Sequence, residues 1–213
     1  MDNIADIRKE YKKQSLLEDE VDVDPLVQFR KWWADAVKSK IDEVNAMTLA
    51  TVNAAGNPSA RIVLLKGFDD NGFVFFTNYN SHKGVELTRR PYAGLVFFWK
   101  ELERQVRIEG TVARISNVAS DLYFNSRPAE SRIGAWASPQ SKVIVNRNVL
   151  EDNMHQYQLQ FADGNIPRPP YWGGFIVKPS LIEFWQGRPG RMHDRILYSL
   201  QENKDWKKER LAP

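Results

Sequence analysis

Apolar and polar residues alternate along much of the chain, and this pattern predicts a protein built mainly of β-strands. In residues 104–115 the side chains of Val106, Ile108 and Val112 fall on one face of the expected strand. The run Asp69-Asp70-Asn71-Gly72 is a strong signal for a hairpin turn. Because the segments follow one another through short turns, we expect an antiparallel sheet, closed as a barrel. The expected strands are residues 46–53, 59–68, 72–78, 92–100, 104–115, 173–178, 180–186, 195–201 and 205–211.

A second spacing of apolar residues predicts helices before and between the strands. Asp24 is suited to cap a helix that begins at Pro25. After it, apolar residues recur at helical spacing and form one stripe, made of Leu26, Phe29, Trp33 and Val37. Ser81 is suited to cap another helix, which continues to Arg90 and stops before Pro91. We also expect a broken helical pair at residues 117–126 and 128–137, and a polar helix at residues 148–162.

The chain divides into a short charged segment and one large domain. Residues 1–23 contain many charges and few residues that can enter a core, so we expect a mobile arm or a loosely docked helix. Residues 24–213 show no internal repeat, linker or low-complexity tract. We expect them to form a single α+β domain, mainly β, with peripheral helices.

Composition and charge argue against several classes of protein. The net charge of +3, from 30 Lys and Arg against 27 Asp and Glu, does not indicate a nucleic-acid-binding protein. The 7 Trp, 7 Tyr and 11 Phe residues fit a β-rich core. Cysteine is absent, which excludes disulfides and a thiol nucleophile. Neither a signal peptide nor a membrane-spanning stretch is present, so we expect a soluble, cytoplasmic protein.

Two short segments place cations where a phosphate could bind. Arg61 and Lys66 lie at the ends of the apolar run RIVLLK, and simple alternation puts them on opposite faces of a strand, so that one can point into a cleft. Lys83 lies in the first turn of the helix that Ser81 caps, where free backbone N–H groups attract anions. Ordinary surface positions would look the same, so both interpretations stay open here.

Tyr123, Arg127 and Ser131 are four residues apart, which stacks them on one face if the helical path continues through Pro128. A phenol, a guanidinium and a hydroxyl on one face are suited to hold a phosphate, because arginine can bind it with two hydrogen bonds. A capped surface helix is the alternative.

The segment EFWQGRPGRMHDR, residues 183–195, concentrates charge beside large apolar side chains. Trp185 and a Gly/Pro turn are followed by Arg191, His193, Asp194 and Arg195. A solvated turn does not need this concentration, whereas a site that stabilises developing charge does. We expect Asp194 to orient a neighbouring arginine rather than to act as a base. The histidines show no metal-ligand spacing, so no metal site is expected, and a structural role is the alternative for His193.

These motifs occur together in one known family. The run LIEFWQG-x-x-x-RMHDR resembles the C-terminal signature of the pyridoxine 5′-phosphate oxidase family, flavin enzymes that make pyridoxal 5′-phosphate. RIVLLK, FFTN, ERQVRIEG, YFNSRP, SRIGAW, SPQS and ERLAP resemble the same family in the same order, so the resemblance covers nearly the whole chain. It implies an FMN-binding split β-barrel that works as a homodimer with the flavin at the subunit interface.

The resemblance also implies roles for individual residues. Arg61 and Lys83 are the candidates for the FMN phosphate, and Arg191 and His193 are the expected catalytic residues over the pyridine ring. The residues expected at FMN are Arg61, Ile62, Val63, Leu64, Leu65, Lys66, Phe76, Thr77, His82, Lys83, Gln105, Gln140, Ser141, Trp185 and Arg195. Those expected at the substrate are Lys9, Glu10, Tyr11, Lys12, Lys66, Tyr123, Arg127, Ser131, Arg191, Met192 and His193, with residues 9–12 closing over it.

Two positions depart from the family pattern. His82 stands where the family usually has a basic residue, which implies a weaker or pH-dependent contact with the FMN phosphate. Phe76 replaces a tyrosine that is often found there. Neither position belongs to the expected substrate set.

The function that the resemblance implies is oxidation of pyridoxine and pyridoxamine 5′-phosphates by O2, with release of hydrogen peroxide. A hydride would pass from C4′ to flavin N5, and vitamin B6 cofactor synthesis would be the outcome. One alternative is a flavin reductase on the same barrel, which has no need of a combined set made of Tyr123, Arg127, Ser131, Arg191 and His193. The other is a basic barrel that binds nucleic acid through its aromatic residues, which calls for a larger basic excess.

Overall fold

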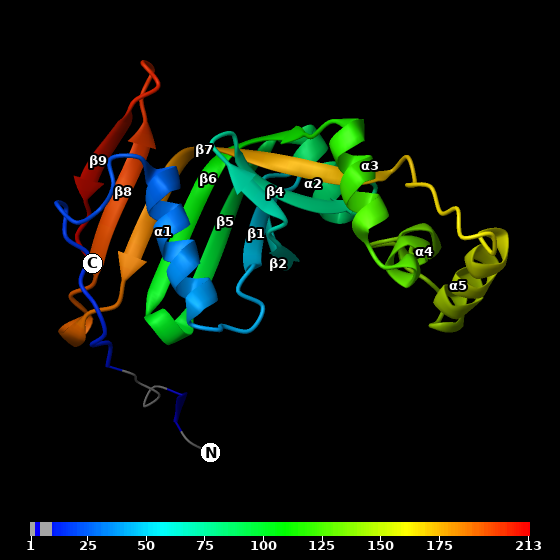
Figure 1. The fold of residues 1–213 in the computed structure, drawn as a ribbon, viewed down its shortest axis with the longest axis horizontal. Coiled ribbons are helices and arrows are strands. Elements are labelled where there is room, and N and C mark those ends of the chain that lie inside the picture. Colours follow the sequence, from blue (N-terminus) through cyan, green and yellow to red (C-terminus); the bar gives the residue numbers. More distant parts are fainter. Residues whose placement is uncertain (1–2, 5–9) are drawn as a thin grey trace.

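The computed structural model describes residues 3–4 and 10–213, and in them the chain forms one strongly curled antiparallel sheet flanked by helices (Figure 1). The strand order is β2-β1-β5-β6-β7-β4-β3, with β8 added to β7 and β9 added to β8. The strands are β1 (Ala46–Val52), β2 (Pro58–Leu64), β3 (Gly67–Asp69), β4 (Gly72–Asn78), β5 (Tyr92–Trp99), β6 (Arg104–Arg114), β7 (Trp172–Gln186), β8 (Asp194–Leu200) and β9 (Trp206–Arg210). This confirms the mainly β architecture and the antiparallel sheet.

The sheet curls because its two edges are joined by the chain itself. β2 and β3 lie at opposite ends of the strand order, yet only Leu65 and Lys66 separate them in sequence. Here the backbone changes partners, since the N–H of Leu65 donates to the carbonyl of Asn45 and the N–H of Lys66 donates to that of Val74. The single strand predicted over residues 59–68 is therefore wrong, and Lys66 lies in the break between two strands.

The barrel is split along β7, which is one continuous strand where the sequence predicted two. The first half of β7 pairs with β4, and its second half pairs with β8 on the same edge. The pairing with β6 shifts register beside Ser180, where β7 carries one extra residue. This bulge lets one strand belong to two parts of the sheet.

Helix α1 (Pro25–Lys38) covers the open face of the barrel and inserts Phe29 into the core. The Asp24 carboxylate caps it at the N–H of Leu26, as predicted. Phe29 packs against rings from three strands, among them Phe73 and Phe97, and is fully buried. The predicted apolar stripe is wrong at its end, because Val37 is 51% exposed. The helix turns Trp32 and Ala36 inward instead, and Trp32 meets Phe184 of β7 edge to face.

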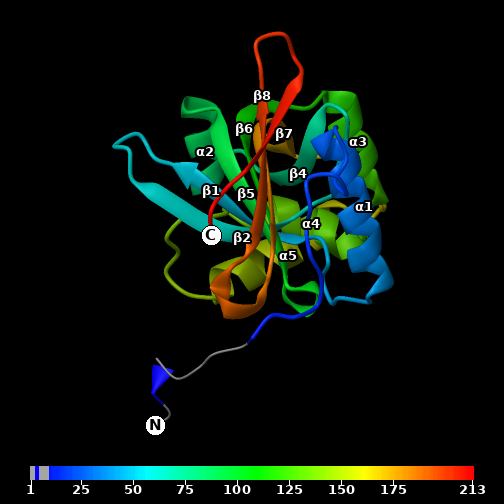
Figure 2. The same cartoon turned by 90° about the vertical axis from the view of Figure 1, so that its left-hand side faces the viewer.

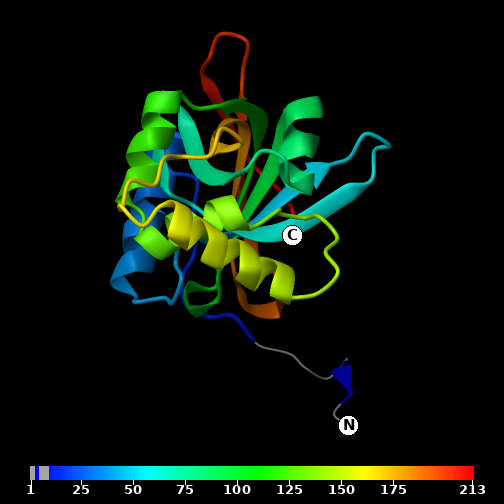
Figure 3. The same cartoon turned by 90° about the vertical axis from the view of Figure 1, so that its right-hand side faces the viewer.

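The remaining helices gather at the other end of the sheet, as Figures 1 and 3 show. Ser81 caps α2 (His82–Arg89) at the N–H of Gly84, as predicted. Pro128 separates α3 (Asn117–Ser126) from α4 (Ala129–Ala137), which confirms the broken pair. α5 (Asn148–Gln160) packs beside α4, with the Asn153 amide donating to the carbonyl of Ala137.

Residues 10–23 contain no helix and run along the end of the sheet where β7 turns into β8 (Figure 2). Leu16 is only 4% exposed and joins the main core together with Val21. The hydroxyl of Tyr198 on β8 donates to the carbonyl of Asp22. The described part of the predicted arm is thus docked, and its mobility stays a prediction. No helix among residues 3–4 and 10–213 has both the length and the apolar character to cross a membrane.

Candidate active site

A hollow of about 520 Å³ opens between the barrel and the α3–α4 corner. It collects cations and hydroxyls from four separate parts of the chain. The residues that line it are Ile62, Val63, Leu64, Lys66, Phe76, Thr77, Lys83, Tyr123, Arg127, Pro128, Ser131, Gln140 and Trp172. Eleven of these thirteen were predicted from the sequence to contact cofactor or substrate.

Tyr123, Arg127 and Ser131 all face this hollow although the helix between them is broken. α3 ends at Ser126, and Arg127 follows it as the C-cap in extended conformation, with its N–H donating to the carbonyl of Phe124. Pro128 then starts α4 without losing a hydrogen bond, since the first N–H groups of a helix have no partner within it. The kink therefore keeps the three side chains together.

Arg127 presents an unsatisfied cation to the hollow. Its Nη1 atom is buried and has no hydrogen-bond partner within the described residues. The guanidinium lies over the ring of Trp172, with its carbon 4.7 Å from the ring centroid. Burial lowers the pKa of Arg127, which is the direction expected where water is withdrawn from a charge before an anion replaces it. An anionic ligand at this point would satisfy both the charge and the orphaned N–H.

Aromatic rings form the wall behind Arg127. Phe76 stacks on Tyr123 with centroids 3.9 Å apart, and on Trp172 at 5.5 Å. Trp172 was not predicted from the sequence, and the two glycines after it were the available signal. A side chain at Gly173 would collide with the hydroxyl of Tyr79, and one at Gly174 would collide with Ile115. The strand that follows Trp172 can therefore pack this closely only because these two positions have no side chain.

A second cationic group lies beside the first. Gln140 accepts from the hydroxyl of Thr77 at 3.2 Å and from the ammonium of Lys83 at 3.3 Å. Burial and, secondarily, the charge of Arg61 lower the pKa of Lys83. Arg61 itself is held by Glu86, 3.3 Å from its Nη2, and does not line the hollow. Glu86 opposes this shift at Lys83 and already pairs with Arg61, so Lys83 is the cation of the two that faces the hollow.

A second set of predicted residues gathers at the turn between β7 and β8. The rings of Trp185 and His193 are 4.6 Å apart, and Tyr11 from the N-terminal segment meets both edge to face, at 5.7 and 5.9 Å. Gln105 is the neighbour of Trp185 across the β6–β7 pairing. Arg191 is exposed, in a left-handed backbone conformation with φ of 62° directly after Gly190. These residues form one cluster, which we call the His193 cluster: Tyr11, Gln105, Trp185, Arg191 and His193.

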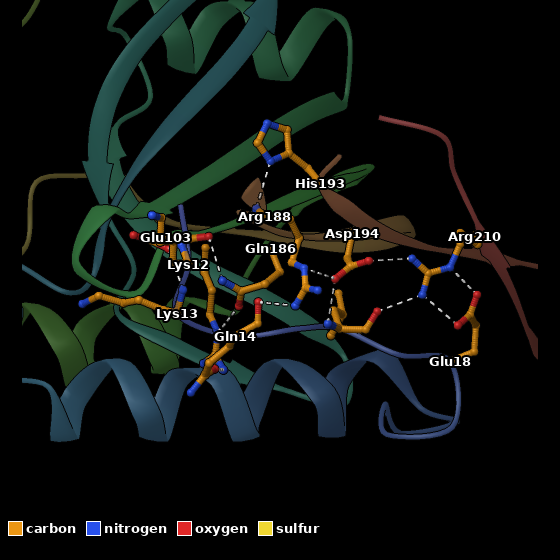
Figure 4. Close-up of polar contacts among 12 residues, drawn as sticks. Lys12, Lys13, Gln14, Glu18, Glu103, Gln186, Arg188, His193, Asp194 and Arg210 are labelled. Atoms are coloured by element: carbon orange, nitrogen blue, oxygen red, sulfur yellow. Dashed lines mark hydrogen bonds and ion pairs between the residues drawn. The ribbon is translucent and has the colours of Figure 1, made fainter. Parts of the chain in front are cut away.

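The protonation state of His193 follows from a backbone contact. The N–H of Arg188 donates to its Nδ1 atom at 3.1 Å, as Figure 4 shows. An amide N–H can only donate, so Nδ1 carries no proton and the neutral ring carries its proton on Nε2. Burial and the nearby charge of Arg191 lower the pKa of His193, with Asp194 opposing them, which favours the same neutral form. His193 is therefore set to donate a hydrogen bond from Nε2.

This arrangement predicts how pH affects stability. With the folded pKa of His193 below the unfolded value of 6.5, its contribution is complete above pH 6.5 and is lost as pH falls through the lowered pKa. His193→Asn keeps an oxygen acceptor for the Arg188 N–H and removes the titration. Denaturant unfolding between about pH 7.5 and pH 5 should show a smaller loss of stability for the variant than for the wild type. Parallel losses would contradict the assignment.

Arg195 and Asp194 are held by ion pairs rather than left free. The carboxylate of Glu183 is 3% exposed and pairs with the Nε of Arg195 at 2.8 Å and with Arg107 at 3.1 Å. Asp194 pairs with Arg210 at 2.9 Å and with Arg188 at 3.6 Å (Figure 4). Asp194 thus contacts neither Arg191 nor Arg195 in these ion pairs, and its predicted role of orienting a neighbouring arginine stays a prediction. Glu183 was not predicted from the sequence, because only the pairing of β7 with β8 places it beside Arg195.

Other predicted site residues lie outside the hollow and the His193 cluster. Leu65 is 4% exposed in the core, and His82 is exposed and lines a separate hollow with Glu86 and Arg89. The exposed residues Ser141 and Met192 flank the hollow and the cluster in sequence, while Glu10 and Lys12 pair with one another at 2.7 Å. Lys9 lies outside the described residues. Their assigned roles stay predictions. No group of three or more His, Asp or Glu suited to a metal occurs among residues 3–4 and 10–213.

The hollow and the His193 cluster lie at opposite ends of β7. Trp172 at its first residue lines the hollow, and Trp185 near its last belongs to the cluster. The 15 residues of β7 span about 45 Å at ~3.3 Å each, less the effect of the bulge. Figure 1 shows α3 and α4 at one end of the sheet and the β7–β8 turn at the other. At this separation along β7, we do not expect one small molecule to contact both sets of a single chain.

Comparisons with known proteins bear on what this arrangement does. Residues 34–161 match a family model described as pyridoxamine 5′-phosphate oxidase, and residues 172–213 match the pyridoxine 5′-phosphate oxidase C-terminal dimerisation region. A pyridoxine/pyridoxamine 5′-phosphate oxidase of Cyanothece sp. is 57% identical over 99% of both chains. One of Cupriavidus necator is 54% identical over the full length of both.

Two solved structures are similar in fold. PhzG from Burkholderia lata, crystallised with tetrahydrophenazine-1-carboxylic acid, superposes with a TM-score of 0.87 at 30% identity and covers 94% of this chain and 99% of its own. A pyridoxamine 5′-phosphate oxidase-related, FMN-binding protein from Nostoc punctiforme gives a TM-score of 0.70 at 20% identity, covering 94% of this chain and all of its own. The second likeness concerns the fold alone, and it confirms the split barrel.

Proposed function

Because the chain belongs to the pyridoxine/pyridoxamine 5′-phosphate oxidase family, we propose that it oxidises pyridoxine and pyridoxamine 5′-phosphates to pyridoxal 5′-phosphate, with FMN as cofactor and O2 as acceptor. Hydrogen peroxide is released, and ammonia leaves when the substrate is the amine. The observation that carries the proposal is the unpaired Nη1 of Arg127 in a hollow that also contains Tyr123 and Ser131.

The phosphate of the substrate binds in this hollow. The fork of Arg127 matches two phosphate oxygens, while the hydroxyls of Tyr123 and Ser131 and the ammonium of Lys66 supply further donors. These contacts lie away from the reacting carbon. They supply binding energy that holds C4′ in place for reaction.

We call Tyr123, Arg127 and Ser131 the clamp, and the residues beside it fit the anionic cofactor. Lys83 and Arg61, whose positive charges repel each other, would hold the FMN phosphate. Thr77 and Gln140 would form hydrogen bonds beside it. When bound, the flavin supplies the acceptor for the hydride that leaves C4′. Trp185 would wall the ring system, and Arg195 would be aimed at it by Glu183.

Two copies of the chain complete each site in this proposal. The clamp of one subunit meets the His193 cluster of the other, since the two sets of one chain are too far apart, and the match of residues 172–213 to a dimerisation region supports a homodimer. Arg191 then stabilises negative charge as the bonds at C4′ break, and His193 orients the substrate by donating from Nε2. His193 accepts no proton while the Arg188 N–H occupies Nδ1.

Glu183→Gln should weaken FMN binding, although Glu183 acts on the flavin only through Arg195 in this proposal. The amide cannot form ion pairs with Arg195 and Arg107, so Arg195 is no longer fixed. We expect the dissociation constant of FMN to rise about tenfold, the loss of one charge-assisted hydrogen bond. Fluorescence titration of the apoprotein with FMN measures it. Glu109→Gln, which removes an exposed carboxylate that also pairs with Arg107, is the matched control and should bind FMN normally.

The test of the function is aerobic turnover of FMN-loaded protein with each of the two vitamer phosphates, following the product aldehyde and hydrogen peroxide. Formation of both products supports the proposal. A yellow protein that makes no aldehyde from either substrate would contradict it and favour the flavin reductase. A protein that binds no FMN would contradict the cofactor as well.

A further inference from the structure

The N-terminal segment is fastened to the sheet at Leu16. The Leu16 side chain is buried in the core, and its N–H donates to Asp194 at 3.1 Å. Arg210 of β9 completes this fastening, because its guanidinium pairs with Glu18 and Asp194 and donates to the carbonyl of Leu16 at 2.9 Å (Figure 4). From Leu16 toward Tyr11 the segment leaves the core and depends on polar contacts.

One buried carboxylate receives the segment just after Tyr11. The Oε2 atom of Glu103 accepts from the N–H of Lys12 at 2.9 Å and from the N–H of Lys13 at 3.1 Å. Glu103 is only 3% exposed, so little water competes for these charge-assisted bonds. Figure 4 shows its carboxylate directed at the two backbone amides.

The backbone of Glu103 holds the surface on which Tyr11 lies. Its carbonyl accepts from the N–H of Gly187 at 2.7 Å and from the side-chain amide of Gln186 at 3.1 Å. A Cβ at Gly187 would lie 2.7–2.9 Å from atoms of Tyr11, so the ring of Tyr11 packs directly on this glycine. Glu103 therefore connects both sides of the Tyr11 contact.

The backbone of Glu103 ends the short 3₁₀ helix Lys100–Leu102, of which it is the C-cap. Its φ of 55° lies in the left-handed region, where glycine or asparagine is usual and other residues are strained. Neither of those side chains would place a carboxylate against the Lys12 and Lys13 amides.

We propose that Glu103 is a positioning residue, which holds Tyr11 against Trp185 and His193 and so keeps the N-terminal segment closed over the substrate. This rests on the proposed function for the location of the substrate, but the anchoring of the segment does not. Glu103 acts through Tyr11 and touches neither reacting atom nor cofactor.

Proteolysis tests the anchor without any substrate. Trypsin cleaves after Lys12 and Lys13, whose amides Glu103 holds. In the FMN-loaded dimer, Glu103→Ala should accelerate formation of the fragments that begin at Lys13 or Gln14 about tenfold. Glu103→Gln should fall between, because its amide oxygen still accepts without a charge. Glu101→Ala is the matched control, since only the backbone carbonyl of Glu101 contacts Lys13. Wild-type cleavage rates in Glu103→Ala would overturn the anchor.

Kinetics test the positioning role. Glu103→Ala should raise KM for the phosphorylated substrate about tenfold and change kcat less than about twofold. Combined with Tyr11→Ala, it should add nothing to the effect of Tyr11→Ala alone, because Glu103 acts through that ring. If the double variant raises KM by the product of the two single effects, the proposal is overturned, because independent effects of this kind indicate a general loss of protein stability.

The two proposals fail separately. If the wild type forms no aldehyde, the proposed function falls, and the cleavage rates still decide the anchor. If Glu103→Ala is cleaved faster while KM stays at the wild-type value, the anchor stands and the positioning role is overturned. Gly187→Ala, which pushes Tyr11 away without altering the carboxylate, should reproduce the rise in KM.

Discussion

Arg191→Met is expected to lower kcat by about 10²- to 10³-fold, the usual effect of removing one charge that stabilises the transition state. Arg191 is exposed on the β7–β8 turn beside His193, and no ion pair with an acidic side chain is found for it in the described chain. Its charge is therefore available to a substrate held by the other subunit. FMN should remain bound, which absorbance of the purified protein measures together with kcat.

The backbone allows a close control for this variant. Lys204, on the turn between β8 and β9, is likewise an exposed cation with a left-handed φ, of 68°. Lys204→Met should leave kcat unchanged. Arg191→Lys should recover part of the activity, since the charge returns without the planar fork. If Arg191→Met instead loses FMN, Arg191 belongs to the cofactor site and its assigned role is wrong.

Arg127→Ala should raise KM about a hundredfold, corresponding to about 3 kcal/mol of binding, with a smaller effect on kcat. The reason is the unpaired Nη1 of a partly buried guanidinium. Burial has already removed part of the water around this charge, so binding of the phosphate requires little further desolvation of Arg127. Steady-state kinetics with pyridoxine 5′-phosphate measure the change. Unphosphorylated pyridoxine should be an equally poor substrate for the variant and for the wild type, because it has no phosphate for Arg127 to bind.

Arg132 provides the comparison for Arg127. It lies five residues further along, in α4, and its Nε is likewise buried without a partner in the described residues, but it does not line the hollow. Arg132→Ala should keep a KM near the wild-type value. A KM for Arg127→Ala within about twofold of the wild type would show that the phosphate binds elsewhere.

Local signals in the sequence predicted the elements that carry the clamp. Ser81 caps α2 as expected, and the spacing of Tyr123, Arg127 and Ser131 correctly indicated one shared face. That prediction survived Pro128 because Arg127 leaves the helix in an extended conformation, which a residue before proline favours. Helix caps and helical spacing depend on a few neighbouring residues, so they can be predicted from the sequence.

The features that were predicted wrongly, or not predicted, depend on tertiary contacts. Val37 is exposed because the core selects the neighbouring face of α1, on which Trp32 meets Phe184. The strand over residues 59–68 breaks because Leu65 and Lys66 take different partner strands. Glu103 and Glu183 act on residues that lie far away in the sequence. Contacts between residues so far apart in the sequence cannot be predicted from periodicity or from a local motif.

The most direct test of the central claim is a mixed dimer of Arg127→Ala and Arg191→Met subunits. The two chains carry different tags, are co-expressed, and the heterodimer is purified through both tags. If the clamp of one subunit works with the His193 cluster of the other, one site of the heterodimer is intact and the other carries both changes. At a substrate concentration near the wild-type KM, where a raised KM lowers the rate, we then expect about half of the wild-type activity from the heterodimer and only a few per cent or less from each parent. If both sets of one chain served the same site, every site would carry one change, and the heterodimer would be as inactive as its parents.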